Sequence, residues 1–286
     1  MEKITRILAV AESPQDGIIV LDKAVAAARC FGAQVELMVA DAAHAHAFAS
    51  ASTKLGYDGV MLSSVHRGQT PMHELIRRRA LESRSDLVIK APAGSRPLQR
   101  WTLDDNDWML AHECPAPLLL VRHRPWTKSM RFGAAVDASD DDIADVARAI
   151  LHTAGFLAMG FHGNLDVLYC ERERHDESLR MKRAVKLAQL VREYHVGCER
   201  LEVLTGEPAE MLAPLVAARQ YDVLVLGAES RRPLRSSITG GTVSRLIDAS
   251  DGDVLLVRAT DVEVGRTSRR VPSRTQQRSD KIEQFV

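Results

Sequence analysis

The stretch from Tyr221 to Arg258 reads YDVLVLGAESRRPLRSSITGGTVSRLIDASDGDVLLVR. It begins with an apolar run, Val223 to Leu226, and it closes with a second apolar run, Val254 to Val257. Short runs of valine and leucine bounded by turn signals are typical of strands buried on both faces of a parallel sheet. Between the runs, Gly240-Gly241-Thr242 opens a segment whose apolar residues have helical spacing. The stretch therefore predicts a strand, a loop, a helix and a second strand.

Glycines stand in this stretch where the loop meets each regular element. Gly227 ends the first apolar run and Gly240 opens the helical segment. The free backbone N–H groups at a helix start attract anions, and glycine lets a phosphate approach the backbone closely. We therefore expect a nucleotide phosphate on Gly227 and the Gly240 turn, with the arginines of the loop neutralising its charge: Arg231, Arg232 and Arg235.

The same unit occurs earlier in the chain. A shift of 136 positions places Asp86 on Asp222, and it also places the run Leu118 to Arg122 on Val254 to Arg258. At the first strands the matching shift is 126, with Val10 on Val136. The chain is therefore interpreted as an internal duplication, with about ten extra residues early in the second copy.

The rest of the chain alternates strand-like and helix-like segments in each copy. This alternation predicts an α/β fold, with two five-stranded, parallel, doubly wound sheets in tandem. We place a first domain at residues 1–124, a linker at 125–130 around Pro125, a second domain at 131–259, and a disordered, polar tail at 260–286.

Bulk properties exclude several classes of function. Equal numbers of basic and acidic residues, 38 each, give no overall charge that favours nucleic acid or an acidic membrane surface. The start, MEKITRILAVAES, has no long apolar stretch, and no later window is long enough to span a bilayer. The four cysteines form no CxxC pair, which favours reduced thiols and a cytoplasmic location: Cys30, Cys114, Cys170 and Cys198.

The second half resembles a universal stress protein domain. ATP-binding members of that family share Gly, two residues, Gly, nine residues, then Gly followed by Ser or Thr. Here Gly227 and Gly240 keep the outer spacing, Ser230 replaces the middle glycine, and Gly241 takes the hydroxyl position with Thr242 next. The resemblance implies an ATP site in this half alone, lined by the five residues just named.

The same resemblance extends to the adenosine end of the site and to the rest of the chain. The acidic residue that follows the first strand in the family falls on Asp137, which the resemblance places at the adenosine end. The segment DWMLAHECPAPLLLVRHRPW, from Asp107 to Trp126, is similar to the junction of the E-type tandem universal stress proteins. The resemblance implies the universal stress protein fold of the adenine-nucleotide α-hydrolase class. It also implies that the last strands of the two halves pair antiparallel, as in an intramolecular pseudo-dimer.

In the first half, acidic residues replace the phosphate-binding turn. The internal shifts place Gly240 on Asp104, Gly241 on Asp105 and Asp137 on Ala11. Carboxylates within a few ångströms of a phosphate repel it, so we expect that the first half does not bind ATP in this way. We interpret these aspartates as the stabilised N-terminus of a helix rather than as a metal site.

Catalytic and metal motifs are weak throughout. The sequence contains no GxSxG elbow, HExxH pair or complete Walker loop, so we assign no catalytic residue and at most slow ATP hydrolysis. His44 and His46 would point to different faces of a helix, and we assign no metal ligand.

Two functions therefore stay open at this point. The first is a cytoplasmic tandem universal stress protein that acts in the stress response through protein partners not yet known, with a further homodimer left open. The alternative is a nucleotide-independent scaffold or carrier with an apolar or lipid-like ligand in the first half, lined by Trp101, Trp108 and Met109.

Overall fold

The computed structural model describes residues 3–40, 48, 56, 59–64, 69–92, 103–137, 144–171, 177–193, 198–228 and 241–259. Ser230 and Gly240 of the expected ATP site, Trp101, the two histidines His44 and His46, and the tail expected from residue 260 lie outside these ranges.

The elements of residues 3–122 alternate as expected for a parallel α/β unit. They are β1 (Arg6–Ala11), α1 (Pro14–Phe31), β2 (Gln34–Val39), β3 (Val60–Ser64), α3 (Met72–Ser83), β4 (Leu87–Lys90), α4 (Asp105–Glu113) and β5 (Leu118–Leu120).

The elements of residues 131–259 follow the same order, with the additional helix α6 between the second and third strands. They are β6 (Arg131–Val136), α5 (Ala144–Gly160), β7 (Asn164–Glu171), α6 (Glu177–Glu193), β8 (Cys198–Thr205), α7 (Pro208–Arg219), β9 (Val223–Gly227), α8 (Thr242–Ala249) and β10 (Asp253–Val257).

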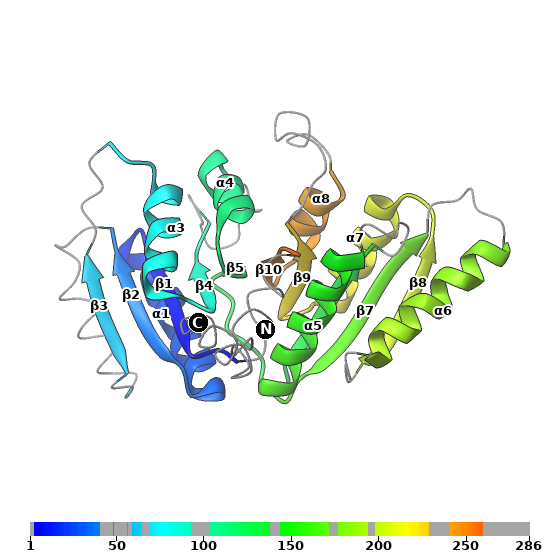
Figure 1. Ribbon diagram of the computed structural model, residues 1–286, viewed down its shortest axis with the longest axis horizontal. Coiled ribbons are helices and arrows are strands. Elements are labelled where there is room, and N and C mark those ends of the chain that lie inside the picture. Colours follow the sequence, from blue (N-terminus) through cyan, green and yellow to red (C-terminus); the bar gives the residue numbers. More distant parts are fainter. Residues whose placement is uncertain are drawn as a thin grey trace, which may run out of the picture.

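All ten strands form one sheet, in the order β3-β2-β1-β4-β5-β10-β9-β6-β7-β8 (Figure 1). Within it, each half contributes five parallel strands, β3-β2-β1-β4-β5 and β10-β9-β6-β7-β8, which is consistent with the two five-stranded sheets in tandem that we expected. The halves join through antiparallel pairing of β5 with β10, which sets Leu119 opposite Leu255. This pairing confirms the arrangement implied by the resemblance, and it satisfies the backbone groups of two strands that would otherwise be exposed edges.

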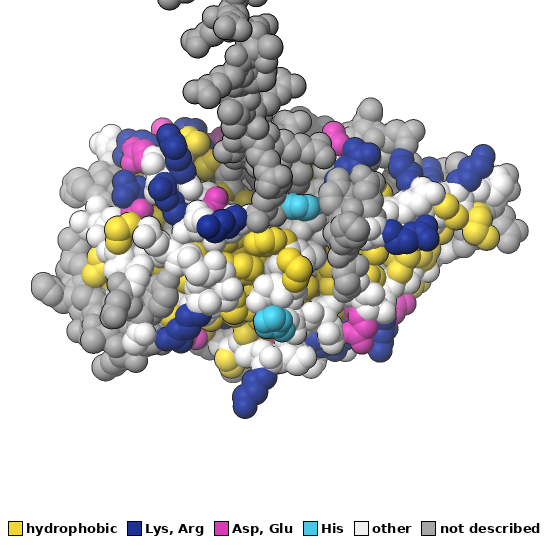
Figure 2. Space-filling model, turned by 60° about the horizontal axis from the view of Figure 1, so that its bottom comes forward, with side chains coloured by type: hydrophobic (Ala, Val, Ile, Leu, Met, Phe, Trp, Pro, Cys, Tyr) yellow, Lys and Arg dark blue, Asp and Glu magenta, His cyan; other side chains and the backbone are white. Residues whose placement is uncertain are grey.

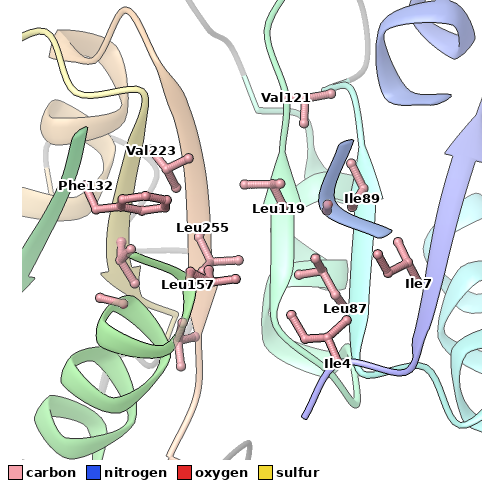
Figure 3. Close-up of a cluster of buried hydrophobic side chains, with 14 of the residues drawn as sticks. Ile4, Ile7, Leu87, Ile89, Leu119, Val121, Phe132, Leu157, Val223 and Leu255 are labelled. Atoms are coloured by element: carbon pink, nitrogen blue, oxygen red, sulfur yellow. The ribbon is translucent and has the colours of Figure 1, made fainter. Parts of the chain in front are cut away.

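The sheet separates two apolar layers, each covered by helices from both halves. Helices α1, α5 and α6 cover one face, while α3, α4, α7 and α8 cover the other. The first layer is continuous across the junction, because one cluster contains Ile7 and Ile89 together with Phe132 and Val223 (Figure 3). The chain therefore folds around cores that its two halves share.

The ladders correct the internal alignment of the two halves. Ile7 pairs with Leu87 in the first half, and Phe132 pairs with Val223 in the second. Because a shift of 136 places Leu87 on Val223, the first strands correspond at a shift of 125 rather than 126. A one-residue slip would turn every side chain to the opposite face of the sheet. The counterpart of Asp137 is therefore Glu12, and the match to Ala11 was wrong.

Aspartates at equivalent positions support the corrected register. The carboxylate of Asp86 accepts from the backbone N–H of Arg6 at 3.0 Å, and that of Asp222 accepts from the N–H of Arg131 at 2.9 Å. Both aspartates thus anchor the start of the neighbouring first strand in the same way. A shift of 125 relates Arg6 to Arg131, as the ladders require.

The surface carries both signs of charge. Figure 2 shows hydrophobic side chains across the middle of one face, with Lys and Arg side chains distributed around them. No helix among the described residues is long and apolar enough to cross a membrane.

Candidate functional site

The candidate site of the second half lies where β6 and β9 end. These strands are parallel neighbours, and from β6 the sheet continues to β7 on one side and to β9 on the other. The chain thus reverses its direction of travel across the sheet at this point, which is where open α/β sheets bind ligands. Asp137 directly follows β6 and is exposed, and Gly227 is the last residue of β9. The structure therefore brings these two predicted residues to the same edge of the sheet.

The N-terminus of α8 faces the same edge, because α8 connects the parallel strands β9 and β10. Gly241 is the N-cap residue and Thr242 is the first helical residue, and no side chain of the described residues, which exclude 229–240, caps the helix. The first backbone N–H groups of the helix have no partner within it and carry partial positive charge. Gly241 has a φ of −64°, which any residue can adopt. Its position at an uncapped helix start is the feature that suits an anion.

Gly227 has a role in packing that the sequence did not reveal. A Cβ atom at this position would lie 2.8 Å from Cγ1 of Val146 on α5. Real Cβ atoms essentially never approach that closely, so glycine allows α5 to pack tightly against the end of β9. Its presence is explained by packing whether or not a phosphate binds beside it.

A buried polar cluster that sequence reasoning missed lies at the end of the neighbouring strand β7. The hydroxyl of Tyr169 donates to the carboxylate of Glu171, and the Arg183 guanidinium on α6 donates to the same carboxylate. Tyr169 and Glu171 are 1% and 2% exposed. The pKa of Tyr169 is raised, mainly by burial. The hydrogen bond to Glu171 and the negative charge of Asp137 raise it further.

The Tyr169 cluster thus lies within electrostatic reach of Asp137. A carboxylate that directly follows the run VLYC at the end of a strand, as Glu171 does in NLDVLYCE, was the signal available in the sequence. Its pairing with Arg183 could be found only from the fold.

The equivalent edge of the first half is occupied by an ion-pair cluster. Lys90 ends β4, and its ammonium lies 2.5 Å from Oδ1 of Asp107 and 2.8 Å from Oε1 of Glu12. Burial lowers the pKa of Lys90, but the nearby carboxylates of Asp107 and Glu12 outweigh it, so the net pKa is raised. The lysine is therefore a cation under ordinary conditions.

The aspartates at the start of α4 are helix caps, as we interpreted them. The Asp104 side chain accepts from the N–H of Asp107 at 2.8 Å, and Oδ2 of Asp107 accepts in return from the N–H of Asp104 at 3.4 Å. This reciprocal arrangement is a capping box, and it satisfies backbone donors at the start of the helix.

Of the residues expected to line an apolar ligand site in the first half, Trp101 lies outside the described part of the chain, so that site stays a prediction. Trp108 is partly buried and packs against the apolar layer beneath α3 and α4. This is core packing, the ordinary use of such a residue.

The four cysteines are all free thiols. None of the four, all of which lie in the described part of the chain, forms a disulfide. Cys114 and Cys170 are buried in the same apolar layer as Trp108.

Comparison with known proteins finds universal stress proteins. Residues 131–258 match the model of the Universal stress protein family. Among curated proteins, the chain is 20% identical over 208 residues to Universal stress protein E of Salmonella typhi, a match that spans 66% of either protein. It is 20% identical over 203 residues to Universal stress protein E of Escherichia coli K12, covering 65% of this chain and 64% of that relative. The matches thus span slightly under two thirds of these universal stress proteins.

Solved structures share the fold over nearly the whole chain. A candidate universal stress protein from Pseudomonas aeruginosa UCBPP-PA14 superposes with a TM-score of 0.75 at 23% identity, covering 93% of this chain and 98% of that one. A universal stress protein from Archaeoglobus fulgidus has a TM-score of 0.64 at 13% identity, covering 90% and 97%. The chain therefore shares its overall fold with these solved structures.

Proposed function

We propose that the chain is a tandem universal stress protein of the E type, with two domains of that fold joined near residues 125–130. The second domain binds an adenine nucleotide, ATP in the first place, and the first domain does not. The protein acts in the cytoplasmic stress response through nucleotide-dependent interaction with partners rather than through turnover of a substrate.

The observation that carries this proposal is the difference between two equivalent helix starts. The start of α4 is capped by aspartates, whereas the start of α8 has no side-chain cap from the described residues. The uncapped end faces the edge of the sheet where Asp137 and Gly227 lie, within the residues that match the family model. An anion suits such a helix start because it accepts from the free N–H groups and interacts favourably with the helix dipole.

We assign the site residues the roles that the family resemblance implies. The triphosphate lies on the Gly240-Gly241-Thr242 turn, with Gly227 and Ser230 bordering it, and Asp137 lies at the adenosine end. Arg231, Arg232 and Arg235 belong to the same loop and supply positive charge.

Equilibrium binding of ATP to the purified full chain tests the proposal, and Gly240→Asp is the decisive variant. The shift of 136 places Gly240 on Asp104, so this change gives the second half the acidic residue of the first. Gly240→Asn is the matched control, because asparagine has the same shape without the charge. We expect the dissociation constant for ATP to be at least tenfold higher in the aspartate variant than in the asparagine variant. Equal binding by wild type and Gly240→Asp would refute the site.

A further inference from the structure

The outer side of β8 is an open end of the ten-stranded sheet (Figure 1). β8 pairs with β7 on one side, and no strand of the described residues pairs with its other side. It has eight residues, CERLEVLT, without the lysine or proline that commonly protects an edge strand. The opposite end of the sheet, β3, has five residues and no charged side chain. Of the two ends, β8 therefore offers the longer template for another strand.

Two apolar side chains of β8 are exposed to solvent at this edge. Leu201 and Val203 are 37% and 45% exposed. They pair in register with Val167 and Tyr169 of β7, which belong to the apolar layer beneath α5 and α6. That layer thus reaches the end of the sheet and is partly uncovered there. A strand added to β8 would remove this apolar area from water.

The side chains that alternate with them are charged and lie on the other face of the strand. The carboxylate of Glu202 lies 2.6 Å from the guanidinium of Arg219 and is 29% exposed. Arg200 is exposed, and its guanidinium makes no ion pair or hydrogen bond with a described residue. The edge therefore carries a cation without a partner two positions from a partly exposed carboxylate.

This spacing is self-complementary for antiparallel pairing of two copies of β8. Side chains directly opposite each other share a face of the sheet, so a twofold axis between the strands must pass beside a residue of each. With the axis at Leu201, Arg200 of each copy lies opposite Glu202 of the other, and Val203 lies opposite Glu199. An axis at Arg200 or at Glu202 would set like charges opposite each other. Because opposite charges across strands stabilise and like charges destabilise, the charges favour the axis at Leu201 over both neighbouring registers.

We propose that β8 pairs antiparallel with β8 of a second copy of this chain, about a twofold axis at Leu201, so that the two sheets become one. Antiparallel pairing already joins the two halves of the chain through β5 and β10. The inference concerns the outer side of β8 alone and does not rest on nucleotide binding.

Light scattering after size-exclusion chromatography of the full chain, over a dilution series, tests the proposal. We expect a concentration-dependent dimer with twice the mass of the chain. Arg200→Glu should raise the dissociation constant of the dimer at least tenfold, because two symmetry-related attractions become repulsions. Lys3→Glu makes the same charge change at an exposed position of the first half and should leave the constant unchanged. A chain that stays monomeric, or one that forms an open series of larger oligomers, would overturn the proposal.

A mixture of two variants tests the charge register. Arg200→Glu and Glu202→Lys each set like charges opposite one another in a pair of identical chains, so neither should dimerise alone. In a mixed pair, the two acidic side chains of one chain lie opposite the two basic side chains of the other, and a heterodimer should form. Two variants that are folded by circular dichroism but do not associate would overturn the register.

Disulfide cross-linking tests the position of the axis without changing these charges. Leu201→Cys places two cysteines directly opposite each other, at a separation that a disulfide can bridge. Val203→Cys is the matched control, because its two cysteines would be roughly 13 Å apart along the strands. Both variants are made with Cys30→Ser and Cys198→Ser, which remove the cysteines that are not buried. Oxidation should cross-link only the Leu201→Cys chain. Equal cross-linking of the two variants, or none at Leu201→Cys in a chain that dimerises, would overturn the proposal.

Discussion

The ammonium of Lys23 lies 2.7 Å from the carboxylate of Asp253, and the side chains are 2% and 1% exposed. Lys23 belongs to α1 in the first half, and Asp253 begins β10 in the second. The carboxylate also accepts from the backbone N–H of Arg122 at 2.8 Å and from the indole N–H of Trp126 at 2.7 Å. The segment that connects the halves and helix α1 thus both contact the carboxylate of Asp253.

Asp253→Asn should therefore destabilise the chain strongly. Burial lowers the pKa of Lys23, and the negative charge of Asp253 partly offsets this by raising it. Removing that charge leaves a buried ammonium with no full counter-charge, a change that costs about 3–5 kcal/mol of unfolding free energy. Urea unfolding followed by circular dichroism measures the loss. Asp145→Asn is the control, since it breaks an exposed pair with Arg148 that is worth less than about 1 kcal/mol. Equal effects of the two variants would contradict this account of the junction.

Gly227→Ala should destabilise the fold by crowding α5. The new Cβ would lie 2.8 Å from Cγ1 of Val146, and overpacking of this kind costs about 1–3 kcal/mol. Val146→Ala removes the obstructing methyl groups, so the double variant should lose less than the sum of the single losses, by about 0.5 kcal/mol or more. Urea unfolding of the four proteins measures the coupling, and strict additivity would show that the clash is relieved elsewhere.

Alkaline pH should destabilise the protein through its buried tyrosines. Burial raises the pKa of Tyr169 and Tyr221, and the carboxylates of Glu171 and Asp166 raise it further. The folded state then holds protons that the unfolded chain releases near pH 10.0, so unfolding free energy falls as the pH rises above that value and is unaffected well below it.

Ultraviolet absorbance of phenolate during a pH titration checks this prediction. Of the four tyrosines in the chain, these two should ionise only as the circular dichroism signal is lost. Replacing Tyr169 and Tyr221 by phenylalanine should remove that late phase. Ionisation of all four near pH 10 in a folded protein would show that the buried hydroxyls are not protected.

Asp222→Ala should also be costly, although Asp222 lies away from the candidate site. Its carboxylate accepts from the N–H groups of Thr127 and Arg131 at 3.0 and 2.9 Å, and alanine would leave both donors unsatisfied. A loss of about 2–4 kcal/mol is expected, against less than about 0.5 kcal/mol for Glu199→Ala at an exposed position. Chemical unfolding measures both, and a small loss for Asp222→Ala would mean that water replaces the carboxylate.

Much of the fold could be predicted because buried parallel strands have a strong sequence signal. Runs such as Val223 to Leu226 are apolar on both faces, and their repetition at a constant shift revealed the internal copy. The shift at the first strands was wrong by one, because Val10 and Val136 are both apolar and the match looks good in either register. Only the ladder shows that these valines point to opposite faces of the sheet.

The candidate site was less predictable, because its polar groups come from separate elements. Asp137 and Gly227 could be placed from the ends of apolar runs. Lys90 and Asp107 are 17 positions apart, and no periodicity connects them. A lysine that ends an apolar strand was the available signal for the first-half cluster, but its partners became visible only once α4 was packed against β4.

The pairing of β5 with β10 has a consequence for how the molecule comes apart. Separating the halves would break that ladder and expose the apolar layer beneath α1 and α5. It would also separate Lys23 from its partner Asp253. Denaturation should therefore proceed in a single concerted step despite the duplicated sequence. For the same reason, a protease cut near Pro125 would leave two fragments that remain associated.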